Sequence, residues 1–266
     1  MKTLIEETFK MFSISTLRYF ILAGVPFVLF YLLLPAKTGR FKIQQKQASK
    51  KDFMREILHS IQSNLVFTII AVAILFTPLR AYTQIYDHIS DYPIGYFWLS
   101  VVFCLIIHDT YFYWMHRLLH HKKIFKLTHV VHHQSTNPSP WTAYSFHLLE
   151  AVTEGAVLLV LVFVLPLHPL SVVLFTVSSF VINVYGHLGY EVAPKWFRRT
   201  WLFEVFNTSV HHNLHHSKFK GNYGLYFRVW DRIMGSEHPD YVKEYDRLQE
   251  RRFGTAMKAP SSSLGN

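Results

Sequence analysis

Four long runs of uncharged, mostly apolar residues constrain the fold of this 266-residue chain more than any other feature. They span 19–36, 57–79, 92–107 and 155–190. A helix needs about 20 apolar residues to cross a bilayer core, where it satisfies its own backbone hydrogen bonds. Half of all residues are hydrophobic, in agreement with this interpretation. The sequence therefore predicts an all-α, polytopic integral membrane protein with about four to five membrane helices.

The charge pattern predicts how these helices are oriented. We expect a short mixed-charge start over 1–16 and then spans near 17–35, 57–79 and 93–115. The loop after the first span is strongly basic, with Lys37, Arg40, Lys42, Lys46, Lys50, Lys51 and Arg55. The positive-inside rule places this loop in the cytoplasm. The net charge of +10 comes largely from residues beside apolar spans, so we expect contact with lipid headgroups and no nucleic acid partner.

The fourth run is interrupted by Leu165-Pro166-Leu167-His168-Pro169, which predicts two short spans joined as a hairpin. The hairpin would return to the cytoplasmic side at His187. The single Cys104 lies within an apolar run, so a disulfide framework and a CxxC metal site are excluded. No small-residue cleavage site follows the first run, and we expect that run to be retained as a span.

Three histidine clusters lie near the predicted span ends: HRLLH at 116–120, HVVHH at 129–133 and HNLHH at 212–216. Residues three and four apart share one face of a helix, so each cluster should present its imidazoles as one group. Eight imidazoles exceed what one tetrahedral ion can use, and we expect two adjacent metal ions. The predicted ligands are His116, His120, His129, His132, His133, His212, His215 and His216. The predicted topology places all three clusters on the cytoplasmic side.

Further residues are candidates for the same site. His187, at the end of the hairpin, is the ninth predicted ligand, because an ionisable residue at the edge of a span is usually functional. Asp109 and Tyr113 share a helical stripe with His116 and His120 and could orient imidazole N–H groups. The remaining candidates, as ligands or supporting groups, are Glu191, His108 and His147.

The donor set favours redox chemistry over hydrolysis. Imidazole suits zinc, iron or copper, but a zinc hydrolase keeps three ligands and an open position. The sequence contains neither HExxH nor GxSxG, the motifs of metalloproteases and serine hydrolases. A nitrogen-rich two-metal site beside the bilayer fits O2-dependent oxidation of lipid C–H bonds. A divalent-metal transporter is the alternative, but its ligands should lie in the middle of the spans.

The three boxes resemble those of the fatty acid hydroxylase/sterol desaturase superfamily. The segment 147–150 resembles the HPLE element of that family, with Leu148 in place of proline, and 187–190 resembles its fourth histidine element. The segments 212–224 and 229–235 are especially similar to sterol C5-desaturases. The resemblance covers about 96–238. We therefore divide the chain into an N-terminal membrane region (1–92), a catalytic domain (93–240) and a polar C-terminal tail (241–266).

The resemblance implies a membrane enzyme with two irons that uses O2 to hydroxylate or desaturate a lipid, and a sterol-like substrate is favoured. It also implies a cytosolic histidine-lined helical cap and electrons from NAD(P)H through a separate carrier protein. The membrane would be the bacterial inner membrane or the endoplasmic reticulum. Hydroxylation of fatty acyl, alkylglycerol or carotenoid chains is the alternative activity. Glu191 stands where some hydroxylases carry a second histidine, which leaves the ligand set of the second metal open.

Overall fold

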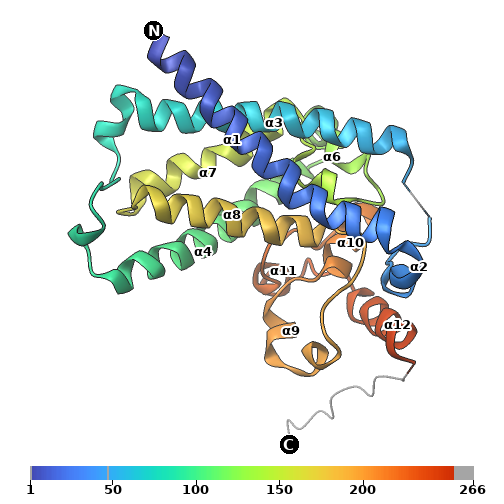
Figure 1. Cartoon of the computed structure of the whole chain (residues 1–266). Coiled ribbons are helices and arrows are strands. Elements are labelled where there is room, and N and C mark those ends of the chain that lie inside the picture. Colours follow the sequence, from blue (N-terminus) through green and yellow to red (C-terminus); the bar gives the residue numbers. More distant parts are fainter. Residues whose placement is uncertain (1, 47, 255–266) are drawn as a thin grey trace, which may run out of the picture.

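The computed structural model describes residues 2–46 and 48–254, and this part of the chain is built from helices (Figure 1). Its extended pairings are isolated bridges, with no sheet among the described residues. The helices are α1 (Lys2–Phe27), α2 (Pro35–Thr38), α3 (Lys50–Phe76), α4 (Ile94–Leu119), α5 (Phe125–Thr128), α6 (Val130–His133), α7 (Leu148–Val164), α8 (Pro169–Gly186), α9 (Trp201–Val205), α10 (Ser209–Lys218), α11 (Val229–Ile233) and α12 (Tyr241–Phe253). The predicted all-α class is confirmed.

Four of the described helical segments are long and apolar enough to cross a bilayer: Thr3–Leu33, α3, α4 and α8. Their outer faces expose large apolar side chains such as Leu17, Ile69 and Trp98. A continuous apolar surface of this kind needs a nonpolar environment around it. The 17-residue α7 and the 18-residue α8 form the predicted hairpin around 165–168. The predicted number of membrane helices is thereby confirmed.

Two helices begin earlier than the spans predicted from their apolar runs. Helix α1 starts at Lys2 rather than after a separate segment 1–16, and it continues as a π-helix over Val28–Leu33. Helix α3 starts at Lys50 instead of 57. There Ser49 Oγ accepts the Asp52 N–H, and the Asp52 carboxylate accepts the Ser49 N–H. Hydropathy locates the apolar part of a helix, whereas caps and helix-forming charged residues set its start.

The long helices pack around two apolar cores. One core joins α3, α4, α7 and α8 through residues that include Ile74, Cys104 and Leu161. The other joins α1 and α8 to the 3₁₀ helix Pro140–Tyr144 through Tyr19, Trp141 and Phe180. Because α3 packs along α7, the proposed membrane region 1–92 and catalytic region 93–240 form one bundle. The domain boundaries themselves remain predictions.

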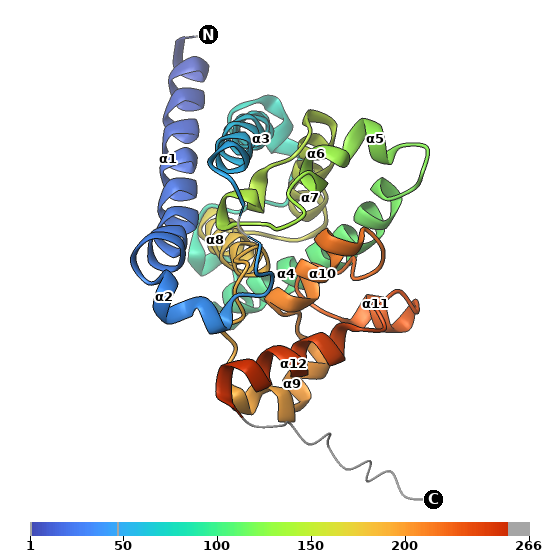
Figure 2. The same ribbon diagram turned by 90° about the vertical axis from the view of Figure 1, so that its right-hand side faces the viewer.

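The short helices form a cap at one end of the bundle, beside the C-terminal ends of α4 and α8 (Figure 2). The basic loop between α1 and α3 lies at this end too. Lys42 pairs with Tyr190 in an isolated bridge, and Gln44 Nε2 donates to Asn213 Oδ1 at 2.9 Å. The basic loop and the histidine clusters therefore lie at the same end of the fold, as predicted.

The first half of the predicted polar tail over 241–266 is a helix that packs against the cap. Residues 241–253 form α12, whose Tyr241 and Tyr245 are fully buried. Both rings pack against Phe203 of α9. The many charged residues of this segment hide its apolar positions, which are four apart and share one helical face. Residues 255–266 of the predicted tail lie outside the described residues.

We predict that α12 contributes strongly to the stability of the cap. The Tyr245→Ala change should lower the free energy of unfolding by about 3–5 kcal/mol, because it removes a buried aromatic ring. The control Arg247→Ala alters a side chain on the same helix that is 77% exposed, and its effect should stay within about 0.5 kcal/mol. Thermal unfolding of the purified variants in detergent measures both. Equal melting temperatures would contradict the packing role of α12.

Candidate metal centre

Nine histidines come together in two adjacent groups at the cap end of the bundle. The five-histidine group contains His116, His120, His129, His133 and His215, and the four-histidine group contains His132, His187, His212 and His216. Within each group, one ring nitrogen per residue lies within 4.8 Å of all the others. These are the nine residues that the sequence predicted as ligands. The rings of His133 and His216, one from each group, are 5.0 Å apart.

The second and third boxes divide their histidines between the two groups. We expected each box to act as one unit, and this was wrong for both. Neighbours on a helix point about 100° apart, so His132 and His133 face different groups. The pair His215 and His216 on α10 does the same. An HH dipeptide therefore supplies one ligand atom to each of two adjacent sites.

The four-histidine group has a geometry that hydrogen bonds alone do not explain. The Nε2 atom of His187 lies 2.9 Å from that of His212 and 3.1 Å from that of His216. It also lies 3.3 Å from Nε2 of His132. A neutral ring nitrogen carries either one proton or one lone pair, so it cannot pair with three others. Nitrogens bound to one ion at about 2.0–2.1 Å would have separations of this size.

The five-histidine group shows similar spacing. The Nε2 atoms of His116 and His129 are 3.0 Å apart. Nε2 of His120 lies 3.0 Å from that of His133 and 3.2 Å from that of His215. The donor atoms of each group thus converge on one point, and the residues present fit one bound cation per group.

The outward-facing ring nitrogens fix the tautomer of several histidines. Their Nδ1 atoms lie against acceptors: His116 on the Tyr223 carbonyl (2.9 Å), His129 on Glu150 Oε1 (2.6 Å), His132 on the Ser145 carbonyl (3.3 Å), His187 on the Asn183 carbonyl (2.8 Å) and His215 on the Gly221 carbonyl (2.7 Å). Carbonyl oxygens only accept, so Nδ1 carries the proton. The inward Nε2 atom then carries the lone pair, which is the form of the ring that can bind a metal.

Burial keeps these rings neutral. It lowers the pKa of His187 and of His215 to about 4. Burial, together with neighbouring histidines, lowers the pKa of His129, His212 and His216 well below the usual value of 6.5. At neutral pH the groups therefore present uncharged nitrogen donors.

Glu150 on α7 is a carboxylate in contact with the centre, and the sequence pointed to it only as a neighbour of His147 in the HPLE-like element. It is fully buried and bonds His129, which lies 21 residues earlier in the chain. Its place in the HPLE-like element was the one signal that could have identified it. The carbonyls of Gly221 and Tyr223 could not have been identified, because backbone acceptors leave no pattern in the sequence.

Asp109 and Tyr113 support the histidines less directly than predicted. Asp109 Oδ1 accepts backbone N–H groups from residues 225–227 at 2.7–3.2 Å. The Tyr113 hydroxyl bonds Ser236 Oγ at 2.8 Å. Neither residue has a hydrogen bond to an imidazole, so the predicted direct orientation was wrong. Both instead bind the segment that contains Tyr223, whose carbonyl accepts a hydrogen bond from His116 Nδ1.

The three remaining candidates belong to neither group. Glu191 is buried, but its carboxylate accepts from the Tyr185 hydroxyl and from the backbone N–H groups of Ala193 and Val210. His147 caps α7, where its Nδ1 accepts the Leu149 N–H. His108 lines an apolar cavity and bonds Tyr226. The structure thus offers no ligand position for them.

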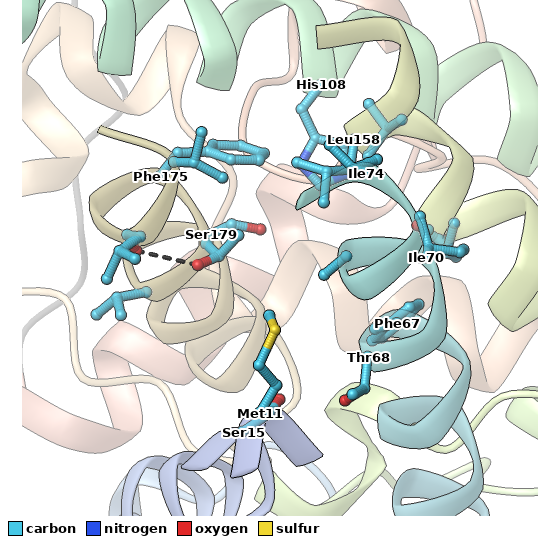
Figure 3. Close-up of a pocket in the computed structure, with 18 of the residues that line it drawn as sticks. Met11, Ser15, Phe67, Thr68, Ile70, Ile74, His108, Leu158, Phe175 and Ser179 are labelled. Atoms are coloured by element: carbon cyan, nitrogen blue, oxygen red, sulfur yellow. Dashed lines mark hydrogen bonds between the residues drawn. The ribbon is translucent and has the colours of Figure 1, made fainter. Parts of the chain in front are cut away.

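That apolar cavity lies between α1, α3, α4, α7 and α8 and has a volume of about 440 Å³ (Figure 3). It is within the usual range for small-molecule sites. Phe112 and Phe146 line it. The Phe112 ring lies 4.9 Å from His116, and the Phe146 ring lies 5.1 Å from His132. Each of these two rings therefore lies between the cavity and one histidine group, and none of the nine histidines lines the cavity itself.

Comparison with known proteins agrees with these features. The family model described as "Fatty acid hydroxylase" matches residues 101–236, which are 136 of the 266 residues and include all nine histidines. The chain is 34% identical over 200 residues to the lathosterol oxidase of Rattus norvegicus (74% of this chain, 65% of the relative). It is 33% identical over 223 residues to that of Mus musculus (79% and 73%).

A fungal relative is similar too. The Delta(7)-sterol 5(6)-desaturase ERG3B of Gibberella zeae is 28% identical over 235 residues (86% of this chain, 71% of the relative). The chain spans about two thirds of the length of these curated relatives. No solved structure matches it significantly. With its family model and its histidine boxes in agreement, the chain belongs to the fatty acid hydroxylase family.

Proposed function

We propose that this chain is a membrane-bound oxidoreductase that binds two iron ions and uses O2 to hydroxylate or desaturate a lipid. The observation that carries the proposal is the pair of converging histidine groups beside an apolar cavity. The names of the relatives, lathosterol oxidase and Delta(7)-sterol 5(6)-desaturase, favour a sterol-like substrate.

The residues of each group would hold one ion. The five-histidine group would hold the first and the four-histidine group the second, with an imidazole donor set that suits iron. Bound iron supplies the redox chemistry that O2 needs to attack a C–H bond. Glu150 keeps the His129 proton on Nδ1, which leaves Nε2 free to bind metal.

The cavity would bind and orient the lipid. Its lining is mainly apolar, so it excludes water from the reacting carbon. Phe112 and Phe146 would hold that carbon beside the two histidine groups, because their rings contact both the cavity and the imidazoles. Helices α1, α3, α4 and α8 are membrane-length and line the cavity, so we expect the lipid to enter from the bilayer.

We further propose that the histidine site faces the cytosol and receives electrons from a separate carrier protein. The basic loop between α1 and α3 lies at the histidine end, which supports this side by the positive-inside rule. His120 is the half-buried member of the two groups. Exposed cations lie next to the first box and the end of α10: Lys122, Lys123, Lys126, Lys218 and Lys220. An acidic carrier surface would complement them.

The alternatives predict different observations. A hydroxylase of fatty acyl, alkylglycerol or carotenoid chains would use the same metal centre on another substrate, which product analysis separates. A divalent-metal transporter would place ligands in the middle of its spans, whereas here they gather at the ends of α4 and α8. The location of the ligands therefore favours the enzyme.

We predict about two iron ions per chain, measured by elemental analysis of protein purified in detergent. The His212→Asn change should remove the ion of the four-histidine group and leave about one ion, because it deletes a converging donor. The change His88→Asn, an exposed histidine outside both groups, should leave two. Fewer than two ions in the unaltered protein, or no loss in His212→Asn, would contradict the proposed centre.

We predict that expression in a host lacking its own sterol C5-desaturase restores the 5,6-unsaturated sterol, as mass spectrometry would show. Glu150→Gln should reduce this product about 10- to 100-fold, because the Nδ1 atom of His129 loses its carboxyl partner. Glu7→Gln changes a partly exposed glutamate on α1 and should have no effect. New hydroxylated acyl chains with unchanged sterols would favour the alternative substrate.

We predict that the metal-free protein loses stability as the pH falls from about 6.5 towards 4. In the folded state the pKa of His187 and His215 is about 4, below the unfolded value of 6.5. Between these values the unfolded chain binds more protons, so acid favours unfolding, and the stability is fully present above pH 6.5. Melting temperatures of chelator-treated protein across this window test the sign. A melting temperature that rises towards acid pH would contradict neutral burial of these rings.

A further inference from the structure

Two polar groups without partners face the otherwise apolar cavity. Glu154 of α7 and His108 of α4 both line it, and both are buried. Among the described residues, the Glu154 carboxyl has no hydrogen-bonding partner and His108 Nε2 has none either. His108 Nε2 is fully buried, so its missing partner is costly and needs an explanation; the Glu154 oxygens are not among the fully buried atoms without a partner.

The hydrogen bonds around His108 define what its free nitrogen can bind. The Tyr226 hydroxyl donates to Ser179 Oγ at 2.6 Å. It lies 2.8 Å from His108 Nδ1 and must accept there, because its one proton is already used. The His108 proton is therefore on Nδ1, and Nε2 carries a lone pair. This nitrogen needs a donor from a bound molecule.

Glu154 adds a second acceptor in the same cavity. Glu154 lines the cavity, and no hydrogen bond or ion pair joins its carboxyl group to another described residue. A carboxyl group accepts through its oxygens, and a protonated one can also donate. A hydroxyl group can donate its one proton to His108 Nε2 and accept a hydrogen bond from Glu154 when that carboxyl group is protonated.

We propose that His108 and Glu154 form the anchor for the hydroxyl group of a lipid alcohol bound in this cavity. The proposal rests on the lipid-oxidising function proposed above and names the substrate's polar group and the residues that select it. A free fatty acid fits less well, because its carboxylate offers no donor to His108 Nε2 and would lie beside the Glu154 carboxyl. A hydrocarbon would leave both groups without partners.

The position of the anchor indicates which part of the lipid reacts. His108 precedes His116 by eight residues on α4, or about 12 Å along the helix. Glu154 follows Glu150, the partner of His129, by one helical turn, or about 6 Å. Figure 3 shows His108 beside Ile74 and Leu158, away from Met11 and Ser15 on α1. A hydroxyl held here leaves carbons a few bonds away closest to the histidines, with the tail along the rest of the cavity.

Arg18 of α1 is the competing polar group at this cavity. It donates to Thr176 Oγ1 at 3.0 Å and has no acidic partner among the described residues. Its charge could instead attract a fatty acid carboxylate. The two residue sets therefore select different lipids, and competition between ligands decides which set binds the polar group.

The test measures displacement of tritiated lathosterol from the full chain, purified in detergent, without turnover. The competitors are lathosterol, cholest-7-ene (the same skeleton without the hydroxyl) and palmitate. We expect cholest-7-ene to compete at least about tenfold more weakly than lathosterol, and palmitate more weakly still. In the double variant His108→Phe, Glu154→Leu, the preference for lathosterol over cholest-7-ene should fall to near one. The control Glu7→Leu should keep it.

Other outcomes overturn the anchor. Equal competition by lathosterol and cholest-7-ene on the unaltered protein would do so, and this comparison needs no variant to fold. Stronger competition by palmitate that is lost in Arg18→Gln would assign the polar site to Arg18. If lathosterol does not bind, displacement of tritiated hexadecanol by hexadecanol and hexadecane tests the hydroxyl preference alone, and no preference there also overturns it.

A failure of the proposed function gives a different result. Unaltered protein that lacks iron or oxidises no lipid, yet prefers the alcohol over the hydrocarbon, would contradict the function and leave the anchor standing. Protein that oxidises sterols but shows no hydroxyl preference would contradict the anchor alone.

Discussion

The structure depends on the convergence of nine uncharged imidazole nitrogens in a buried space. Each inward Nε2 atom lies about 3 Å from the Nε2 atoms of neighbouring histidines. Hydrogen bonds cannot account for all of these short distances, because each neutral ring carries only one proton. Such an arrangement is stable when a cation occupies the centre. The ends of α4 and α8, the short α6 and the cap helix α10 must therefore meet at one place.

A layer of acceptors holds these rings in position. Glu150 and four backbone carbonyls pair with the outward Nδ1 atoms, and Asp109 and Asp231 bind the backbone of the segment that supplies two of these carbonyls, Gly221 and Tyr223. Gly221 shows how tightly this segment is packed, since its φ is +77° and an added Cβ would lie 2.5 Å from the Ser236 carbonyl oxygen. The positions of the ligands thus depend on backbone conformation as much as on side chains.

The same helices connect the metal centre with the bilayer. Helix α4 carries His116 at one end and His108 two turns earlier, and α7 carries Glu150 and then Glu154. Along each helix, the residue nearer the cap serves the histidines and the deeper one faces the cavity. The cavity and the two histidine groups are therefore held in position by the same helices.

The sequence alone determined the helical membrane fold, the hairpin and the nine histidines of the two groups. Apolar runs and histidine spacing are local patterns, which can be recognised in the sequence without knowledge of the fold. Tertiary structure decided how the boxes divide between two groups, because adjacent histidines point in different directions. It also decided that Glu150 contacts His129, that Asp109 and Glu191 bind backbone instead of imidazoles, and that α12 belongs to the core. These are contacts between residues distant in sequence, and no spacing along the chain encodes them.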